Sequence, residues 1–153
     1  MIVYRLAKEK YCNDLSGKGA ELSGGRWNSK GSVIIYTSAS RALCTAEIAV
    51  HIPIGIIPGN YFLAEIEIQD DITMEEVSVL QLPAKWNQFP HSHETQKIGD
   101  QFIASNKTLL LKVPSAVVQG DFNYLINPQH ADFSKVKIRN TESFSFDERL
   151  FRR

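Results

Sequence analysis

The sequence lacks three features that would each point to a particular environment or partner. It has no apolar run of the roughly 18 residues that a membrane-spanning helix needs. Its start, MIVYRLAKEK, lacks the basic-then-apolar order of a secretory signal. Lys and Arg together number 17, as do Asp and Glu, so the basic excess of a nucleic-acid-binding protein or a polybasic membrane anchor is missing. We therefore expect a cytoplasmic protein with no membrane anchor and no direct contact with nucleic acid.

Cysteine is also scarce. The two cysteines, Cys12 and Cys44, do not form a CxxC pair, which predicts free thiols in a reducing compartment and no structural zinc site. His91 and His93 stand two residues apart in FPHSHETQ, but this segment is typical of a loop and offers no third ligand. We therefore expect no metal ion.

Length and patterning predict a single α+β domain over residues 1–153. The apolar content of 43% is enough to bury a core. Strands outnumber helices and no regular βαβ repeat occurs, which favours a mixed sheet. Glu9–Gly31 is rich in Gly, Ser, Asn and Lys and predicts a long loop. The expected strands cover 2–7, 32–37, 61–68, 109–113 and 124–126, and a final hairpin is expected from 136–138 and 143–146. One helix is expected from Ser38 or Ser40 to His51, and a second over Thr95–Ser105.

Glu47 is the most informative single residue. It lies in the predicted helix RALCTAEIAVH, which is apolar around nearly its whole circumference and is therefore expected to be buried on more than one side. Glu47 projects just off the main apolar face, beside Leu43 and His51. A carboxylate in such surroundings is costly unless a cation or hydrogen-bond donors meet it. The spacing leaves two interpretations open, a partly buried catalytic carboxylate and a surface glutamate at an exposed gap.

The segment Gly24-Gly25-Arg26-Trp27-Asn28 is the second informative stretch. Paired glycines allow the backbone to approach a ligand closely or to adopt a positive φ. The Arg26 guanidinium is a fork suited to phosphate or carboxylate, and the Trp27 ring offers either a stacking face or a core anchor. A tight turn with Trp27 packed inward explains the same residues, so the segment alone leaves ligand binding and a structural turn open.

Two further residues gain meaning from the strands on which they lie. Arg5 interrupts the apolar strand at the start of the chain, so it needs a partner there, either Glu47 or an anionic ligand. Tyr36 lies at the end of SVIIYT, directly before the Glu47 helix, where the sequence is consistent with a core aromatic residue and with a site residue.

These motifs together resemble the RES domain family. The first half of the likeness is SGGRWNSKGSVIIYTSASRALCTAEIAVHI, the second half is TQKIGDQFIASNKTLLLKVPSAVVQGDFNYLINPQHADFSKV, and FSFDERLF closes it. The likeness covers nearly the whole chain, from Val3 to Phe151. One departure is Ser29-Lys30 after GGRWN, where the family usually has a proline or a small residue.

The resemblance implies a fold, an activity and a partner. RES proteins are similar in fold to ADP-ribosyltransferases, with a split mixed sheet around an NAD+ cleft. They are toxins of bacterial toxin–antitoxin systems that deplete NAD+ by hydrolysis or phosphorolysis, and some ADP-ribosylate a protein. NAD+ is then the substrate, no prosthetic group is implied, and the partner is an Xre-like helix-turn-helix antitoxin that blocks the active site. Two alternative functions stay open: a mono-ADP-ribosyltransferase, and a non-catalytic module that binds NAD+ or ADP-ribose. A homodimer also stays open as the oligomeric state.

The resemblance also assigns roles to residues of the first half. Arg26 and Glu47 match the arginine and the glutamate of the family's name, Tyr36 matches its active-site tyrosine, and Arg5 matches an arginine of its first strand. Glu47 would face the positive charge that develops on the ribose when the nicotinamide leaves. Tyr36 would stack on the nicotinamide, and Arg26 and Arg5 would grip the pyrophosphate.

The family's serine has two candidates. Ser115 in VPSAVV is the first choice, and its hydroxyl would position Glu47 or the ribose; Ser105 in IASNKT is its rival. Trp27 and Asn28, which follow Arg26, are expected as further NAD+ contacts.

Overall fold

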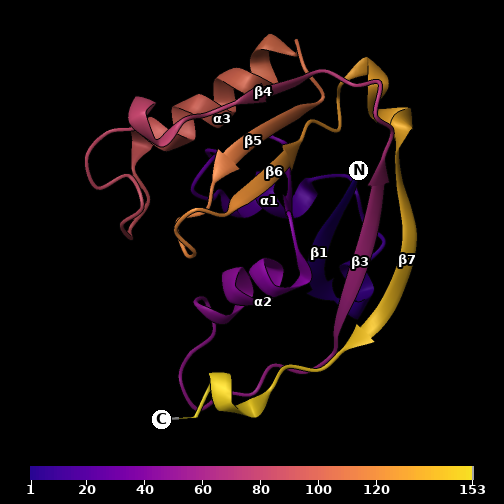
Figure 1. Cartoon of the computed structure of the whole chain (residues 1–153), viewed down its shortest axis with the longest axis vertical. Coiled ribbons are helices and arrows are strands. Elements are labelled where there is room, and N and C mark those ends of the chain that lie inside the picture. The colour runs from indigo at the N-terminus through magenta and orange to yellow at the C-terminus, as the bar shows by residue number, and fades with distance from the viewer. Residues whose placement is uncertain (153) are drawn as a thin grey trace.

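A seven-stranded sheet forms the centre of the protein, of which the computed structural model describes residues 1–152 (Figure 1). The strands are β1 (Ile2–Lys8), β2 (Ile35–Ser38), β3 (Tyr61–Ile68), β4 (Met74–Glu76), β5 (Leu110–Pro114), β6 (Phe122–Ile126) and β7 (Val136–Phe144). They lie in the order β4-β5-β6-β2-β1-β3-β7, with β4 and β5 parallel and the other neighbours antiparallel. The predicted α+β fold with a mixed sheet is therefore confirmed.

The sheet is split into two halves that meet at a narrow junction. β1 pairs with β3 along all 7 of its residues, but its register with β2 consists of one pair, Tyr4 opposite Ser38. Figure 1 shows β5 and β6 running in a different direction from β3 and β7. Helix α2 (Arg41–Ala49) lies beside the junction and contacts both β1 and β2.

Each half of the sheet has its own apolar cluster, and a third cluster joins them. Helix α3 (His93–Ser105) covers the half that contains β5 and β6, where its Phe102 packs with Trp27 and Leu125. The cluster around α2 and the other half includes Leu6, Cys44, Leu63, Phe146 and Phe151. The joining cluster includes Val3, Ile35, Ile66, Leu110 and Ile126.

Elements with a strong local pattern lie where the sequence predicts them. β3 has the predicted bounds, because its alternating apolar residues place Leu63 and Ile66 in the core. α2 begins after Ser40, whose Oγ accepts a hydrogen bond from the Leu43 amide at 3.1 Å, so Ser40 rather than Ser38 is the N-cap. α3 begins at His93, two residues before the predicted start.

Two predictions for less regular segments are wrong, and one short strand was not predicted. The stretch 9–31 is not a plain loop, because it contains the 3-10 helix η1 (Glu9–Tyr11) and the short helix α1 (Lys18–Ser23). The stretch 136–146 does not form a hairpin; β7 is one continuous strand that pairs with β3 around a bulge at Glu65/Ile66. β4 was not predicted, since its three residues are exposed and lack alternation, and its pairing with β5 defines it.

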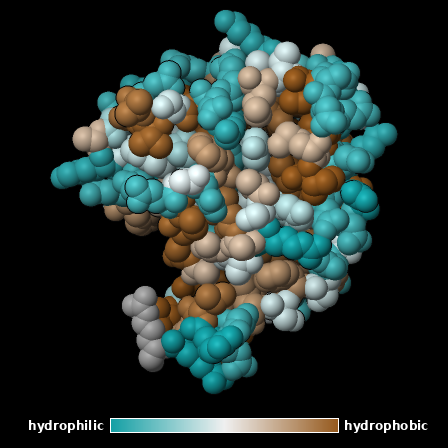
Figure 2. Space-filling view, viewed as in Figure 1, coloured by the Kyte–Doolittle hydropathy of each residue, from teal (hydrophilic) through white to brown (hydrophobic). Residues whose placement is uncertain are grey.

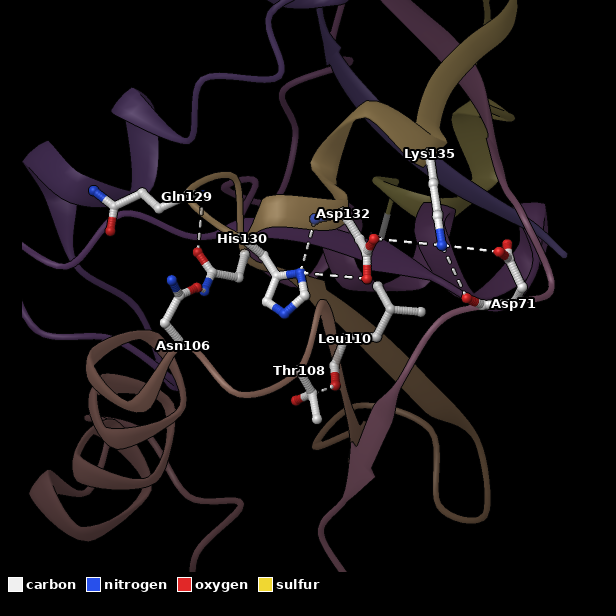
Figure 3. Close-up of polar contacts among 9 residues, drawn as sticks. Asp71, Asn106, Thr108, Leu110, Gln129, His130, Asp132 and Lys135 are labelled. Atoms are coloured by element: carbon white, nitrogen blue, oxygen red, sulfur yellow. Dashed lines mark hydrogen bonds and ion pairs between the residues drawn. The ribbon is translucent and has the colours of Figure 1, made fainter.

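The connection between β6 and β7, which includes NPQHADF, is held by polar contacts (Figure 3). His130 caps the 3-10 helix η3 (Ala131–Lys135), because its Nδ1 accepts a hydrogen bond from the Asp132 amide at 3.1 Å. Lys135 Nζ lies 2.9 Å from Asp71 Oδ2, on the segment between β3 and β4. The NPQHADF motif therefore stabilises the connection between β6 and β7 and links it to the connection between β3 and β4.

Gly99 lets α3 rest directly on the backbone of Trp27. A Cβ at this position would overlap the Trp27 carbonyl oxygen, so the helix would have to move away. We expect Gly99→Ala to lower the free energy of unfolding by about 3 kcal/mol, measured by denaturant titration. Gly19→Ala is the control, because a Cβ there meets nothing within 4 Å and alanine favours the α1 helix. Equal stability of the two variants would contradict this account of the packing.

Candidate active site

A cavity of about 830 Å³ opens beside the junction of the two sheet halves. Its walls come from the GGRWN segment, β2, α2, the connection before α3 and the loop between β5 and β6. The lining residues are Gly24, Gly25, Arg26, Trp27, Tyr36, Glu47, Val50, His51, Asn87, Phe89, His91, Ala116, Val117 and Asn123. Segments that are distant in sequence thus converge on one space large enough for a small organic ligand.

Glu47 is presented to this cavity by α2 and is met by two donors. Its Oε1 accepts hydrogen bonds from Ser115 Oγ at 2.8 Å and from Asn123 Nδ2 at 2.5 Å. The Ser115 hydroxyl oxygen accepts the amides of Val117 and Val118 at 3.1 and 3.0 Å, so its lone pairs are occupied and its proton is directed to Glu47. Of the two interpretations open from the sequence, the half-buried and hydrogen-bonded carboxylate is the one that the structure places here.

The two candidate serines lie in different places. Ser115 is 5% exposed and contacts Glu47. Ser105 lies at the end of α3, donates to the Phe102 carbonyl at 3.1 Å and lines a separate cavity of about 440 Å³. The structure therefore brings Ser115, and not Ser105, to the carboxylate.

Tyr36 and Asn28 form a buried polar contact at the floor of the cavity. The Tyr36 hydroxyl accepts a hydrogen bond from the Trp27 amide at 3.1 Å and donates to Asn28 Oδ1 at 2.7 Å. Burial raises the pKa of Tyr36 above its ordinary value, so the phenol stays neutral. A Cβ on Gly25 would meet the Tyr36 hydroxyl at 2.7 Å, which explains the glycine at that position.

Asn28 shapes the turn from inside. It is 0% exposed, and its Nδ2 donates to the carbonyls of Ala20 and Ser32 at 2.8 and 3.1 Å. The Asn28 side chain therefore has no free polar atom to offer to a ligand, because its Oδ1 and Nδ2 are both used within the protein. Trp27 is 3% exposed and packs against Trp86 with ring centroids 6.0 Å apart, so its ring is a core anchor rather than a stacking platform for a ligand.

Arg26 lines the cavity and holds one of its walls in place. Its Nη1 donates to the main-chain carbonyls of Trp86 and Gln88 at 2.7 and 3.0 Å. Burial lowers the pKa of Arg26, while the charge of Glu47 in the same cavity opposes that effect. Nη1 is thus committed to the connection 83–90, and the rest of the guanidinium makes no hydrogen bond to residues 1–152.

Arg5 does not meet Glu47. Its Nη1 donates to the Tyr11 carbonyl at 2.9 Å and no ion pair joins it to Glu47, so of the two partners that the sequence left open, Glu47 is not the one found here. Arg5 lines two smaller cavities of about 170 and 420 Å³, both of which share Tyr36 with the main cavity. The guanidinium therefore lies in spaces that adjoin the main cavity.

Among the lining residues that the sequence did not identify as site residues are Asn123, His51 and His91. Asn123 contacts Glu47 from β6, and His51 and His91 line the cavity from α2's end and from the connection before α3. The pKa of His91 is lowered by burial and by the positive charges of Arg26 and His51, which favours a neutral ring. Helical spacing places His51 beside Glu47, but no periodic pattern marks Asn123 or His91, because their approach to the cavity depends on the tertiary fold.

Residues 1–152 contain no group of three or more His, Cys, Asp or Glu side chains that could hold a metal ion. No helix within the same range has the length and apolar character needed to cross a membrane.

An apolar rim, formed by Val50, Ile54 and Leu150, adjoins the cavity. Val50 lines both the main cavity and a neighbouring one of about 370 Å³, which Ile54 and Leu150 also line. Each of the three is more than 50% exposed: 58%, 65% and 54%. Figure 2 shows apolar surface next to the C-terminal end of the chain.

The comparisons with known proteins agree with this architecture. The model of the RES domain matches residues 2–147. The chain belongs to the RES domain family. It is 38% identical over 149 residues to a protein of Sphingobium sp. named Prs ADP-ribosylating toxin, covering 96% of this chain and 92% of that protein. It is 36% identical to Toxin Res of Yersinia enterocolitica, covering 98% of this chain and 99% of that protein.

The RES fold is also found among solved structures. A chain from the crystal structure of the Mycobacterium tuberculosis MbcT–MbcA toxin–antitoxin complex superimposes with a TM-score of 0.69. The likeness covers 98% of this chain and 86% of that chain at 17% sequence identity. The mixed α+β fold that the sequence predicts is thus shared with this structure.

The Tyr36 hydroxyl supplies a measurable part of the stability of the cavity floor. Tyr36→Phe leaves the Trp27 amide and Asn28 Oδ1 buried without their partner, so we expect the free energy of unfolding to fall by about 2 kcal/mol. Tyr124→Phe is the control, since the Tyr124 hydroxyl makes no hydrogen bond to residues 1–152, and its effect should stay within about 0.5 kcal/mol. Similar losses in both variants, measured in urea, would show that the Tyr36 contact is not structural.

Proposed function

We propose that this RES protein is a toxin that consumes NAD+ by breaking the bond between nicotinamide and ribose. The observation that carries the proposal is the Glu47 carboxylate, held by Ser115 at 2.8 Å in a cavity of about 830 Å³. Family membership and the toxin names of its relatives support it.

The chemistry follows from the charge that develops during bond cleavage. As the bond between the anomeric carbon and the nicotinamide nitrogen breaks, the nitrogen takes the bonding electrons and the ribose becomes positively charged. A fixed carboxylate that faces this charge stabilises the transition state more than the ground state. Water or inorganic phosphate then attacks the anomeric carbon and releases its proton. Glu47 acts as the electrostatic and hydrogen-bonding partner of the ribose.

The other lining residues fit the rest of the dinucleotide. The Tyr36 ring borders the cavity and offers an apolar face to the nicotinamide. The atoms of Arg26 that the connection 83–90 does not use, together with Arg5 in the adjoining cavities, supply positive charge for the pyrophosphate. NAD+ is in this account the substrate, and the reaction uses no prosthetic group.

A protein acceptor is the second candidate. It is favoured by one observation, the name Prs ADP-ribosylating toxin of the relative that is 38% identical. The bond that breaks is the same, and a nucleophile of the target protein replaces water or phosphate. Incubation with radiolabelled NAD+ and a bacterial lysate separates the two, since transfer labels a discrete protein band and hydrolysis or phosphorolysis gives free ADP-ribose or its phosphate.

Glu47→Gln tests the role of the carboxylate. Glutamine keeps the shape and the acceptor oxygen for Ser115 but removes the charge, so we expect turnover of NAD+ to fall about 10²–10³-fold. The KM for NAD+ should change little because the charge on the ribose develops in the transition state, and the melting temperature should hold or rise because a neutral amide is cheaper to bury. Glu67→Gln, on an exposed position of β3, is the control and should keep full turnover.

Two results would overturn the proposal. The first is purified wild-type protein that leaves NAD+ unchanged both with and without phosphate. The second is a stable Glu47→Gln variant with full turnover. A variant that melts at a lower temperature but turns over normally would instead make Glu47 a structural residue.

We further propose that an antitoxin of the Xre-like helix-turn-helix type covers the cavity and its apolar rim. An exposed apolar patch beside a cavity is typical of a protein interface, and the structurally similar chain comes from a toxin–antitoxin complex.

Co-expression of the antitoxin should restore growth, and Ile54→Lys should weaken the complex at least about tenfold without changing NAD+ turnover. Leu80→Lys, at an exposed site away from both cavities, should leave the affinity unchanged. Equal affinity of both variants in calorimetry would place the interface elsewhere.

A further inference from the structure

Asn123 approaches Glu47 from a rigid part of the sheet. It lies on β6 between Ser38 of β2 and Val113 of β5, and it pairs with both in register. Its Nδ2 is 2.5 Å from Glu47 Oε1. The amide is therefore positioned by three adjacent strands, whereas the carboxylate that it meets is carried by a helix.

The Asn123 side chain makes no other hydrogen bond within residues 1–152. Its Oδ1 is buried and has no partner there. Buried polar atoms of this kind destabilise a protein and are rare in native structures. The orientation of the amide follows from Glu47, because the opposite orientation would place Oδ1 against a carboxylate oxygen. An amide with one buried contact and one unsatisfied oxygen is a poor choice for stability alone, so its single contact is the reason for its presence.

Both donors meet the same oxygen of Glu47. Ser115 Oγ and Asn123 Nδ2 converge on Oε1, and Oε2 accepts no hydrogen bond from residues 1–152. One donor would fix the position of an oxygen but leave the carboxylate free to rotate about its last bond. Two donors, one on β6 and one in the loop directly after β5, fix its plane as well. Glu47 thus offers Oε2 to the cavity in one orientation.

We infer that Asn123 is a positioning residue that, together with Ser115, orients Glu47 so that Oε2 receives a ribose hydroxyl. This inference rests on the proposed function and names the oxygen that carries it out. Asn123 stays neutral and transfers no proton, so its whole effect on the reaction passes through Glu47. Its removal should therefore lower kcat and leave the binding of the rest of the dinucleotide intact.

Asn123→Ala tests the inference with three readouts. We expect kcat for NAD+ cleavage to fall about 10–100-fold, KM to stay within about twofold, and the melting temperature to hold or rise because a buried unsatisfied oxygen is removed. Asn123→Asp keeps the shape but replaces the donor with a like charge beside Glu47, so its kcat should fall at least as far. Asn127→Ala is the matched control, since Asn127 is 0% exposed and bonds to Asn106 at 2.8 Å; it should lose melting temperature and keep the kcat of the folded fraction.

The double variant with Glu47→Gln decides between a positioning and an independent role. If Asn123 acts through the carboxylate, Asn123→Ala should reduce turnover by less than about twofold once Glu47 has lost its charge. Multiplied losses in the double variant, or an Asn123→Ala protein that melts lower but turns over normally, would overturn the inference. Wild-type protein that arrests growth without consuming NAD+ would contradict the proposed function alone. The same variants would then be scored by growth arrest, and the role of Asn123 would again be decided by whether Asn123→Ala has an effect of its own once Glu47 has lost its charge.

Discussion

One residue pair, Tyr4 opposite Ser38, joins β1 to β2, and the two halves of the sheet diverge directly past it. Because backbone pairing ends there, the space beside the junction has to be filled by something other than a strand. Helix α2 fills part of it, beginning three residues after the end of β2 with Ser40 as its cap. Glu47 follows in the second turn of this helix, and donors from the neighbouring half reach it. The position of the carboxylate is thus a consequence of where pairing stops.

The residues that the family resemblance assigns to one site divide into two groups in space. Glu47, Tyr36 and Arg26 border the cavity. Asn28 lies beneath it and, together with the main-chain amide of Trp27, holds the hydroxyl of Tyr36, while the Trp27 ring is packed into the core. A short motif such as GGRWN therefore contains side chains that face a ligand and side chains that give those residues their geometry, and the order of letters does not separate the two.

The sequence predicts the elements whose pattern is local. β3 alternates and α2 has a serine cap, so both lie close to their expected bounds. β4 and the middle of β7 are defined by their partner strands, which no local pattern reports. The site follows the same division: the unusual place of Glu47 on an apolar helix is visible in the sequence. The contact of Asn123 with Glu47 depends on the register of β6, and the inward turn of Asn28 depends on Tyr36 being opposite, so neither was predicted.

Arg26 binds the connection 83–90, which forms one wall of the cavity, through main-chain atoms alone, and this affects how the wall can evolve. Arg26 binds the carbonyl oxygens of Trp86 and Gln88, which every amino acid carries. Substitution of the neighbouring side chains Asn87, Phe89 or His91 leaves those two hydrogen bonds in place. The wall can therefore change its chemistry one residue at a time without losing its attachment, so relatives with the same anchored backbone are free to diverge in what their cavities accept.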